Sequence, residues 1–171
     1  TMATFEDLRN QGHQPIELER GSRSFKIWKA IKIKRVRVPD ILCLRCGRRV
    51  ESRAKTKMEI TMSHSLSDPQ RGWDVGLEDH DVIAFVKCSR TGEGPLDWKA
   101  GPIVQYVMVK DLRKASAEGR TVTERAKGAQ EGFEVRVTWP AALASTRGTV
   151  ESIGADAIRH RKQASGKVVR L

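Results

Sequence analysis

The stretch from Val38 to Lys55, VPDILCLRCGRRVESRAK, constrains the fold of this chain more than any other. It contains an apolar run at Ile41–Leu44 and then a Cys-Gly-Arg turn sequence. The return strand that we expect after the turn, RRVESRAKTKMEITM, continues beyond Lys55. The return alternates with a period of two, which is typical of a strand with two different faces. Val50, Ser52 and Ala54 share one face, and charged residues share the other. We therefore expect a β-hairpin whose apolar first strand is central in a sheet.

The segments around this hairpin predict an α+β or α/β domain. Residues 4–11 suit a short helix, and RGSRSFKIWKAIK spaces its apolar residues three to four apart, as an amphipathic helix does. Residues 81–88 and 103–110 are apolar runs with the length of buried strands. For residues 1–114 we expect a mixed central sheet flanked by helices.

The second part of the chain indicates a change in organisation. Residues 115–131 are poor in bulky apolar side chains and rich in small and charged ones, which predicts a linker or an exposed helix. Three strand-like runs follow, FEVRVTW, RGTVESI and GKVVRL, and they predict a small β unit in residues 132–171. Because the chain stops inside an apolar run, we expect this unit to be incomplete and the native chain to carry further domains.

Positive charge is concentrated in and before the hairpin. The net charge is +11, and the window from Arg20 to Lys57 holds fourteen Lys or Arg against two acids. Such a field attracts a polyanion, so we expect nucleic acid, more simply duplex DNA, as the partner. The residues expected to contact its phosphates are Arg35, Arg37, Arg48, Arg49 and Lys57.

Membrane and secretory signals are not evident in the sequence. No stretch approaches the roughly 18 apolar residues of a membrane span, and the N-terminal stretch TMATFEDLRNQG has no apolar run like that of a secretory signal. Three cysteines make an odd count with no disulfide framework, which fits a reducing compartment. We expect a cytoplasmic protein without membrane contact.

The two acids in the basic window are candidates for a metal site. Metal-dependent phosphodiester hydrolysis needs oxygen ligands, and two carboxylates on adjacent strands can hold Mg²⁺ or Mn²⁺. We expect Asp40 to pair near Arg53, leaving Glu51 one diagonal step away, about 7–8 Å between backbones. Arg53 or Lys55 on the same face then contacts the scissile phosphate. An ordinary ion pair between Asp40 and Arg53 has the same sequence pattern.

These residues resemble the PD-(D/E)XK, or restriction-endonuclease-like, superfamily. Pro39-Asp40 matches the PD half of its motif, and Glu51-Ser52-Arg53 stands where the family has acid-x-Lys. The resemblance covers roughly residues 16–112. It implies a mixed sheet flanked by helices in an αβββαβ order, and Mg²⁺-dependent endonuclease activity.

The resemblance also implies roles for individual residues. Asp40 and Glu51 take the place of the metal ligands, and Arg53 takes the place of the catalytic lysine. This is a departure from the family pattern, because arginine keeps the positive charge but does not give up a proton. Lys55, one step further on the same face, is the alternative catalytic cation.

The cysteines allow a different metal. Cys43-Leu44-Arg45-Cys46-Gly47 has the C-x-x-C-G form of a zinc knuckle. Cys88 is the third cysteine, and a fourth ligand has to be His64 or His80. A Zn²⁺ site is therefore one hypothesis, and reduced cysteines in the core are the other, since Cys43 lies in an apolar run.

Three functions remain open at the level of sequence. The first is a Mg²⁺-dependent DNA endonuclease. The second is a non-catalytic nucleic-acid-binding module, which Zn²⁺ can stabilise; the arginine at position 53 favours it. The third is a protein-interaction domain of a larger assembly, in which the basic charge steers an acidic partner.

Overall fold

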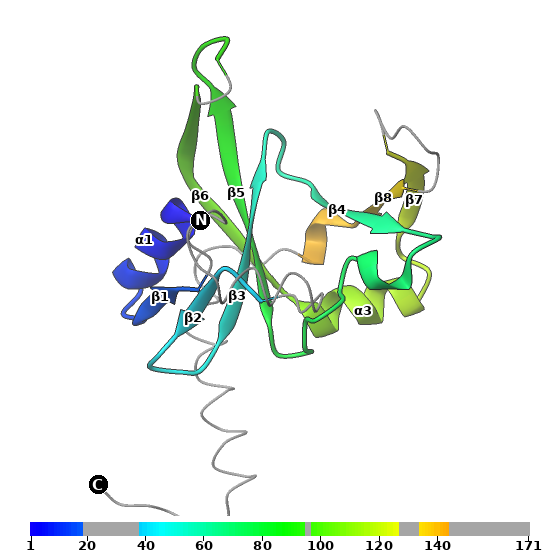
Figure 1. Cartoon of the computed structure of the whole chain (residues 1–171), viewed down its shortest axis with the longest axis horizontal. Helices are drawn as coiled ribbons and strands as arrows, with labels where there is room; N and C mark the ends of the chain where they lie inside the picture. The colour runs from blue at the N-terminus through cyan, green and yellow to red at the C-terminus, as the bar shows by residue number, and fades with distance from the viewer. Residues whose placement is uncertain (19–37, 95–96, 127–133, 144–171) are drawn as a thin grey trace, which may run out of the picture.

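The computed structural model describes residues 1–18, 38–94, 97–126 and 134–143, and its strands form two sheets (Figure 1). The strands of the first sheet are β1 (Pro15–Glu17), β2 (Ile41–Cys43), β3 (Arg49–Lys55), β5 (Val82–Arg90) and β6 (Trp98–Met108). Those of the second sheet are β4 (Ile60–Ser65), β7 (Val122–Arg125) and β8 (Glu134–Trp139). The helices are α1 (Met2–Asn10) and α3 (Val109–Ala117), with 3-10 turns at Pro69–Arg71 and Ala141–Leu143.

This architecture is a mixed α+β fold, which confirms the expected class at that level. The first sheet has the order β1-β2-β3-β5-β6 and is mixed, because β3 and β5 run parallel and its other pairs run antiparallel. The second sheet has the order β4-β8-β7. The short N-terminal helix and the strand predicted at 81–88 lie close to where the sequence predicts them, whereas the strand predicted at 103–110 runs from Trp98 to Met108 and residues 109–110 begin α3. The helix expected at RGSRSFKIWKAIK lies outside the described residues.

The predicted hairpin forms, with a turn one residue earlier than expected. β2 pairs antiparallel with β3, and Ile41 lies opposite Val50. The Cys43 N–H donates to the Arg48 carbonyl at 2.8 Å, so these two residues close the turn. Gly47 ends it with a φ of 70°, a conformation that favours glycine. The earlier turn shifts the register, so that the residues on β3 opposite β2 differ from those expected.

The return strand predicted as one long run is two strands in two sheets. β3 ends at Lys55, and the chain then bends into β4, which starts at Ile60 and pairs with β8. Ile60, Thr61 and Met62 are all buried, so β4 does not continue the alternation seen in β3. The chain returns to the first sheet through β5, which lies beside β3 in parallel.

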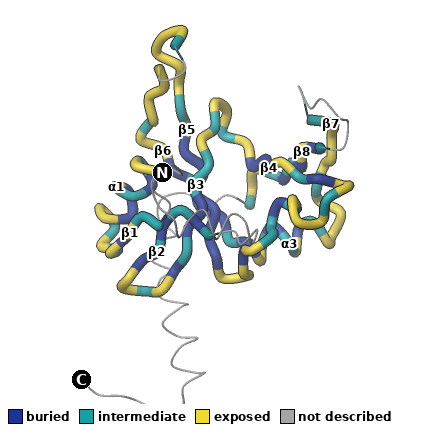
Figure 2. The backbone as a smooth tube through the Cα atoms, in the orientation of Figure 1, coloured by how far each residue is buried: buried dark blue, intermediate teal, exposed yellow. Residues whose placement is uncertain are grey.

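Strand β5 separates two hydrophobic cores. Its Val82, Ala84 and Val86 pack on the α1 side, and its Ile83 and Phe85 pack against the second sheet and α3. All five are buried, as predicted for this apolar run. Figure 2 shows the buried backbone concentrated where β3 and β5 run side by side.

The expected boundary at residues 115–131 is not a break between sheets. Its described residues hold the end of α3 and strand β7, and both β7 and the β8 strand beyond it belong to the sheet of β4. Trp139 of β8 also contacts Trp73 edge-on, with ring centroids 5.0 Å apart. A buried aromatic pair of this kind ties β8 to the preceding chain. The two later strand-like runs lie outside the described residues.

The helices of the described ranges, α1 and α3, are both too short to cross a membrane.

Candidate metal centre and acid pair

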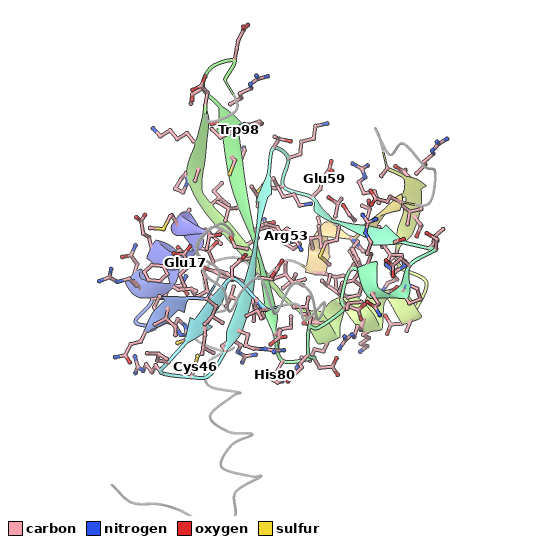
Figure 3. All side chains as sticks on the ribbon, viewed as in Figure 1. Glu17, Cys46, Arg53, Glu59, His80 and Trp98 are labelled. Carbon is pink, nitrogen blue, oxygen red and sulfur yellow. The ribbon has the colours of Figure 1, made fainter. Side chains whose placement is uncertain are left out.

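Three metal-ligating side chains meet at the closed end of the β2–β3 hairpin. The Nδ1 atom of His13 lies 3.5 Å from the Sγ atom of Cys43 and 3.6 Å from that of Cys46. The three donor atoms all lie within 4.8 Å of one another. Figure 3 shows Cys46 at this end of the hairpin, beneath β1 and β2. Cys43 is buried, and the other two are partly buried.

The C-terminal end of α1 directs His13 towards the hairpin. Gly12 has a φ of 79°, the left-handed conformation that commonly ends a helix. The His13 N–H donates to the Leu8 carbonyl and the Gly12 N–H to the Arg9 carbonyl, each at 3.0 Å. This hydrogen-bond pattern is the Schellman motif, which reverses the chain after the helix. His13 is therefore placed by the helix cap and by the short strand β1 that follows.

Hydrogen bonds hold the turn of the hairpin against the end of α1. The Leu44 N–H donates to the Gln14 carbonyl at 2.8 Å, and Arg45 Nη1 donates to the Gly12 carbonyl at 2.7 Å. In the turn itself, the Gly47 N–H donates to the Cys43 carbonyl. The two cysteines and the histidine thus come from segments that are already fixed to one another.

The pKa shifts of His13 and Cys43 favour the protonation states that bind a metal, whereas that of Cys46 opposes it. Burial lowers the pKa of His13, and Arg45 and Arg48 lower it further, which favours the neutral imidazole. Burial raises the pKa of the Cys43 thiol, but backbone hydrogen bonds at Cys46 and Gln14 outweigh it and leave the pKa lowered. Burial raises the pKa of Cys46. The Cys43 thiol is therefore easier to deprotonate than the Cys46 thiol.

The structure replaces Cys88 with His13 in the expected set of zinc ligands. Cys88 lies on β5, where its thiol donates to the Val86 carbonyl, and it is not part of the group. His64 Nδ1 accepts from the Trp73 N–H, and His80 is exposed beside Glu78. Of the described residues, only His13 joins the two cysteines. The sequence signal for His13 was its position next to Gly12, directly after the predicted helix. Because His13 lies about 30 residues from the cysteines in the sequence, local patterns did not link them.

Asp40 and Glu51 lie closer in register than expected. The β2–β3 pairing reaches Ile41 with Val50, so Asp40 and Glu51 are the next residues beyond this pair, and Arg53 lies two residues further along β3. The Ser52 N–H donates to Asp40 Oδ2 at 2.7 Å, which ties the carboxylate to β3. Asp40 thus lies just before β2, bound to β3 next to Glu51.

Both basic residues near this pair make contacts within the protein. Arg53 Nη2 lies 2.7 Å from Glu51 Oε1, so the expected ion pair of Arg53 forms with Glu51. Lys55 Nζ donates to the carbonyl and hydroxyl of Thr61 on β4, and it lies 5.5 Å from the centroid of the Phe85 ring. Burial lowers the pKa of Lys55, and Arg136 lowers it further. Figure 3 shows Arg53 beside β3, on the side of the second sheet.

Two residues expected to contact phosphate are engaged inside the protein. Arg48 is buried, and its Nη1 donates to the His80 carbonyl at 2.6 Å. Arg49 forms a two-point ion pair with Asp81, with Nε and Oδ1 2.8 Å apart, and the Asp81 side chain is fully buried. This ion pair raises the pKa of Arg49. The physical reason for both is that the start of β3, just after the turn, packs against the loop before β5.

The remaining members of the basic set have different positions. Lys57 is exposed in the bend between β3 and β4, where a phosphate can reach it. Arg35 and Arg37 lie outside the described residues. Two of the hairpin's arginines, Arg48 and Arg49, therefore form contacts within the protein. Lys57 is an exposed cation in the bend that leads to the second sheet.

Comparisons with protein-family models, with curated proteins and with solved structures find no match for this chain.

Proposed function

We propose that this chain is a nucleic-acid-binding domain that hydrolyses phosphodiester bonds with Mg²⁺ or Mn²⁺, using Asp40 and Glu51 as metal ligands. The observation that carries the proposal is the hairpin register, which places Asp40 and Glu51 directly beyond the pair of Ile41 with Val50. Two carboxylates at this spacing are the oxygen donors that Mg²⁺ prefers. They are also the two acids within a window of fourteen basic residues.

The order of elements supports the same proposal. The PD-(D/E)XK core follows an αβββαβ order, and the chain runs α1, β1, β2, β3 and later β5 beside β3. Asp40 directly precedes β2 and Glu51 lies on β3, the second and third strands after α1. The connection from β3 to β5 differs, because in the described structure it carries β4 and a 3-10 turn in place of a helix.

The residues around the acids suggest how the site is arranged. Mg²⁺, when bound, supplies an activated water and offsets negative charge on the leaving oxygen. The Ser52 N–H fixes one oxygen of Asp40, and Arg53 fixes one oxygen of Glu51. The Arg53 side chain is 41% exposed, so its guanidinium can contact a phosphate while it orients Glu51. The two carboxylates can therefore hold a metal ion only if Arg53 leaves an oxygen of Glu51 available to bind it.

The partner that the charge favours is duplex DNA. With a net charge of +11, the chain can release several counterions from a duplex on binding. Affinity is then expected to fall steeply between about 50 and 200 mM salt. A flat response over this range would contradict a phosphate-dominated interface.

The test of the proposal is plasmid cleavage in Mg²⁺ or Mn²⁺. Asp40→Asn keeps an acceptor for the Ser52 N–H and removes the charge, and Glu51→Gln does the same for the second ligand. We expect each to lower the cleavage rate by at least about 100-fold, equivalent to about 2.7 kcal/mol. Glu59→Gln is the matched control, because Glu59 is an exposed acid in the bend between β3 and β4. Cleavage that survives both substitutions would show that the acid pair is not the site.

One observation favours a second candidate, a non-catalytic nucleic-acid-binding module. The 2.7 Å ion pair between Arg53 and Glu51 already satisfies the negative charge of a largely buried carboxylate. If that pairing persists with Mg²⁺ present, the chain binds nucleic acid without cutting it. Salt-dependent binding with no cleavage in either metal, for the wild type and both variants alike, is the result expected for this candidate.

A further inference from the structure

We propose that His13, Cys43 and Cys46 bind one Zn²⁺ ion, which fastens the end of α1 to the β2–β3 hairpin. This inference is independent of the proposed hydrolysis, because it concerns other residues and another metal.

The two nitrogen–sulfur distances are those of a tetrahedral zinc site. Zinc binds cysteine sulfur at about 2.3 Å and histidine nitrogen at about 2.0–2.1 Å, and a tetrahedral angle then separates the sulfur and nitrogen atoms by about 3.6 Å. The Nδ1 atom of His13 lies 3.5 and 3.6 Å from the two sulfur atoms. The ligands therefore need little rearrangement to accept the ion.

The type of donor selects the metal. Two thiolates and one imidazole suit Zn²⁺, whereas Mg²⁺ takes oxygen ligands. Within the described part of the chain no fourth His, Cys, Asp or Glu joins the group. The fourth position of the tetrahedron is left to a water molecule or to a donor from outside these residues. Each cysteine binds as a thiolate, so thiol protons pass to the solvent when the ion binds.

The local backbone is built as such a site requires. In the C-x-x-C-G turn, Gly47 takes the left-handed conformation that lets the chain fold back around the sulfurs. His13 reaches the turn from a separate segment, which hydrogen bonds from Leu44 and Arg45 already hold in place. An ion here links residues 30 positions apart and adds a constraint to the hairpin that carries Asp40 and Glu51.

The competing explanation is a group of reduced thiols hydrogen-bonded to the imidazole. It accounts for the same distances, so geometry alone does not separate the two explanations, and metal affinity does. Oxidation of the cysteines to a disulfide is a third outcome, which thiol counting in the presence and absence of reductant detects.

The experiment is a Zn²⁺ titration of metal-free, reduced protein, followed by a Co²⁺ titration as a spectroscopic probe. We expect one ion per chain, and with Co²⁺ a thiolate charge-transfer band of the size given by two sulfur ligands. His13→Ala and Cys46→Ser change partly buried residues, so they are less disruptive than a change at buried Cys43. Each should weaken Zn²⁺ binding by at least about 100-fold, more than the roughly 10–100-fold cost of losing an outer-shell partner.

Two matched controls complete the design. Cys88→Ser removes the cysteine on β5, and His80→Ala removes an exposed histidine, and both should bind Zn²⁺ as the wild type does. Circular dichroism of each variant shows that it is folded. The proposal is overturned if the wild type binds no more tightly than Cys46→Ser, if Cys88→Ser weakens binding equally, or if Cys43 and Cys46 form a disulfide in reducing buffer. None of these readouts depends on nucleic-acid cleavage.

Discussion

The two ends of the β2–β3 hairpin present two different sets of metal donors. At the closed end, His13, Cys43 and Cys46 face one another, with their donor atoms within 4.8 Å. At the open end, Asp40 and Glu51 are held by partners of their own, and an arginine already neutralises Glu51. The first set brings together three of the four donors of a tetrahedral zinc site, whereas the second shares its charge with an internal arginine.

This difference indicates different roles for the two ends. Soft donors held in a fixed geometry suit a permanent structural ion, which strengthens the fold. Carboxylates that share their charge with an arginine suit an ion that arrives with a substrate, when a phosphate gives the arginine a new partner. The hairpin thus carries a proposed site for stability and a proposed site for chemistry.

Both ends depend on how firmly the hairpin is fixed to the rest of the sheet. The Arg49–Asp81 ion pair anchors it just after the turn, with a fully buried carboxylate that also accepts the Glu78 N–H at 2.7 Å. We expect Asp81→Ala to lower the free energy of unfolding by about 3 kcal/mol, since it leaves Arg49 partly buried without its partner. Urea unfolding measures the change. The control is Glu78→Ala, which removes an exposed partner 3.5 Å from Arg49 and should change stability by less than about 0.5 kcal/mol. Equal losses in both variants would show that the buried pair is not the anchor.

Removal of Zn²⁺ should weaken the closed end of the hairpin. An ion at about 1,000 times its dissociation constant stabilises the folded chain by about 4 kcal/mol, because it binds the folded state. We therefore expect a chelator to lower the melting temperature of the wild type and to leave His13→Ala unchanged. Differential scanning calorimetry with and without chelator makes the measurement. A chelator effect of the same size in both proteins would place the stabilising ion elsewhere.

The open end can be tested by restoring the family pattern. Arg53→Lys creates the acid-x-Lys spacing and replaces the two-point donor by a single ammonium, which releases Glu51 more easily. We expect cleavage in Mg²⁺ to rise by about 10-fold, equivalent to about 1.4 kcal/mol in the barrier. Single-turnover kinetics on a duplex substrate measures it. Arg53→Ala serves as the comparison, because it frees Glu51 without supplying a cation; if it cleaves as fast as Arg53→Lys, the residue only blocks the site.

Local sequence patterns predicted the β2–β3 hairpin, the buried strand β5 and the short helix α1, because each of these elements depends mainly on residues close together in the sequence. The pairing of Ile41 with Val50 did not follow from the pattern, since a turn shifted by one residue changes every partner across the hairpin. The split between β3 and β4 was missed for a similar reason. The bend after Lys55 depends on the distant strand β8, which gives β4 its partner.

The candidate sites show the same limit. The cysteine pair and the acids were visible as residues of the right type, but their partners come from other segments. His13 meets the cysteines through a helix cap, and Arg48 and Arg49 are drawn inward by the loop before β5. A count of basic residues therefore overstates the surface charge of the hairpin, because it includes arginines that form internal contacts.

The smallest expected effect concerns the exposed cation next to the open end. Lys57 lies in the bend after β3 and is exposed, unlike Arg48 and Arg49. If it contacts a phosphate, Lys57→Ala should weaken binding to all duplex sequences alike and reduce the slope of log affinity against log salt by about 1. Fluorescence anisotropy over a salt series measures the slope. Lys110→Ala on α3 provides the control, because Lys110 is also exposed but lies on a different element. An unchanged slope for Lys57→Ala would move the nucleic-acid interface away from the acid pair, and the case for hydrolysis at the open end would weaken with it.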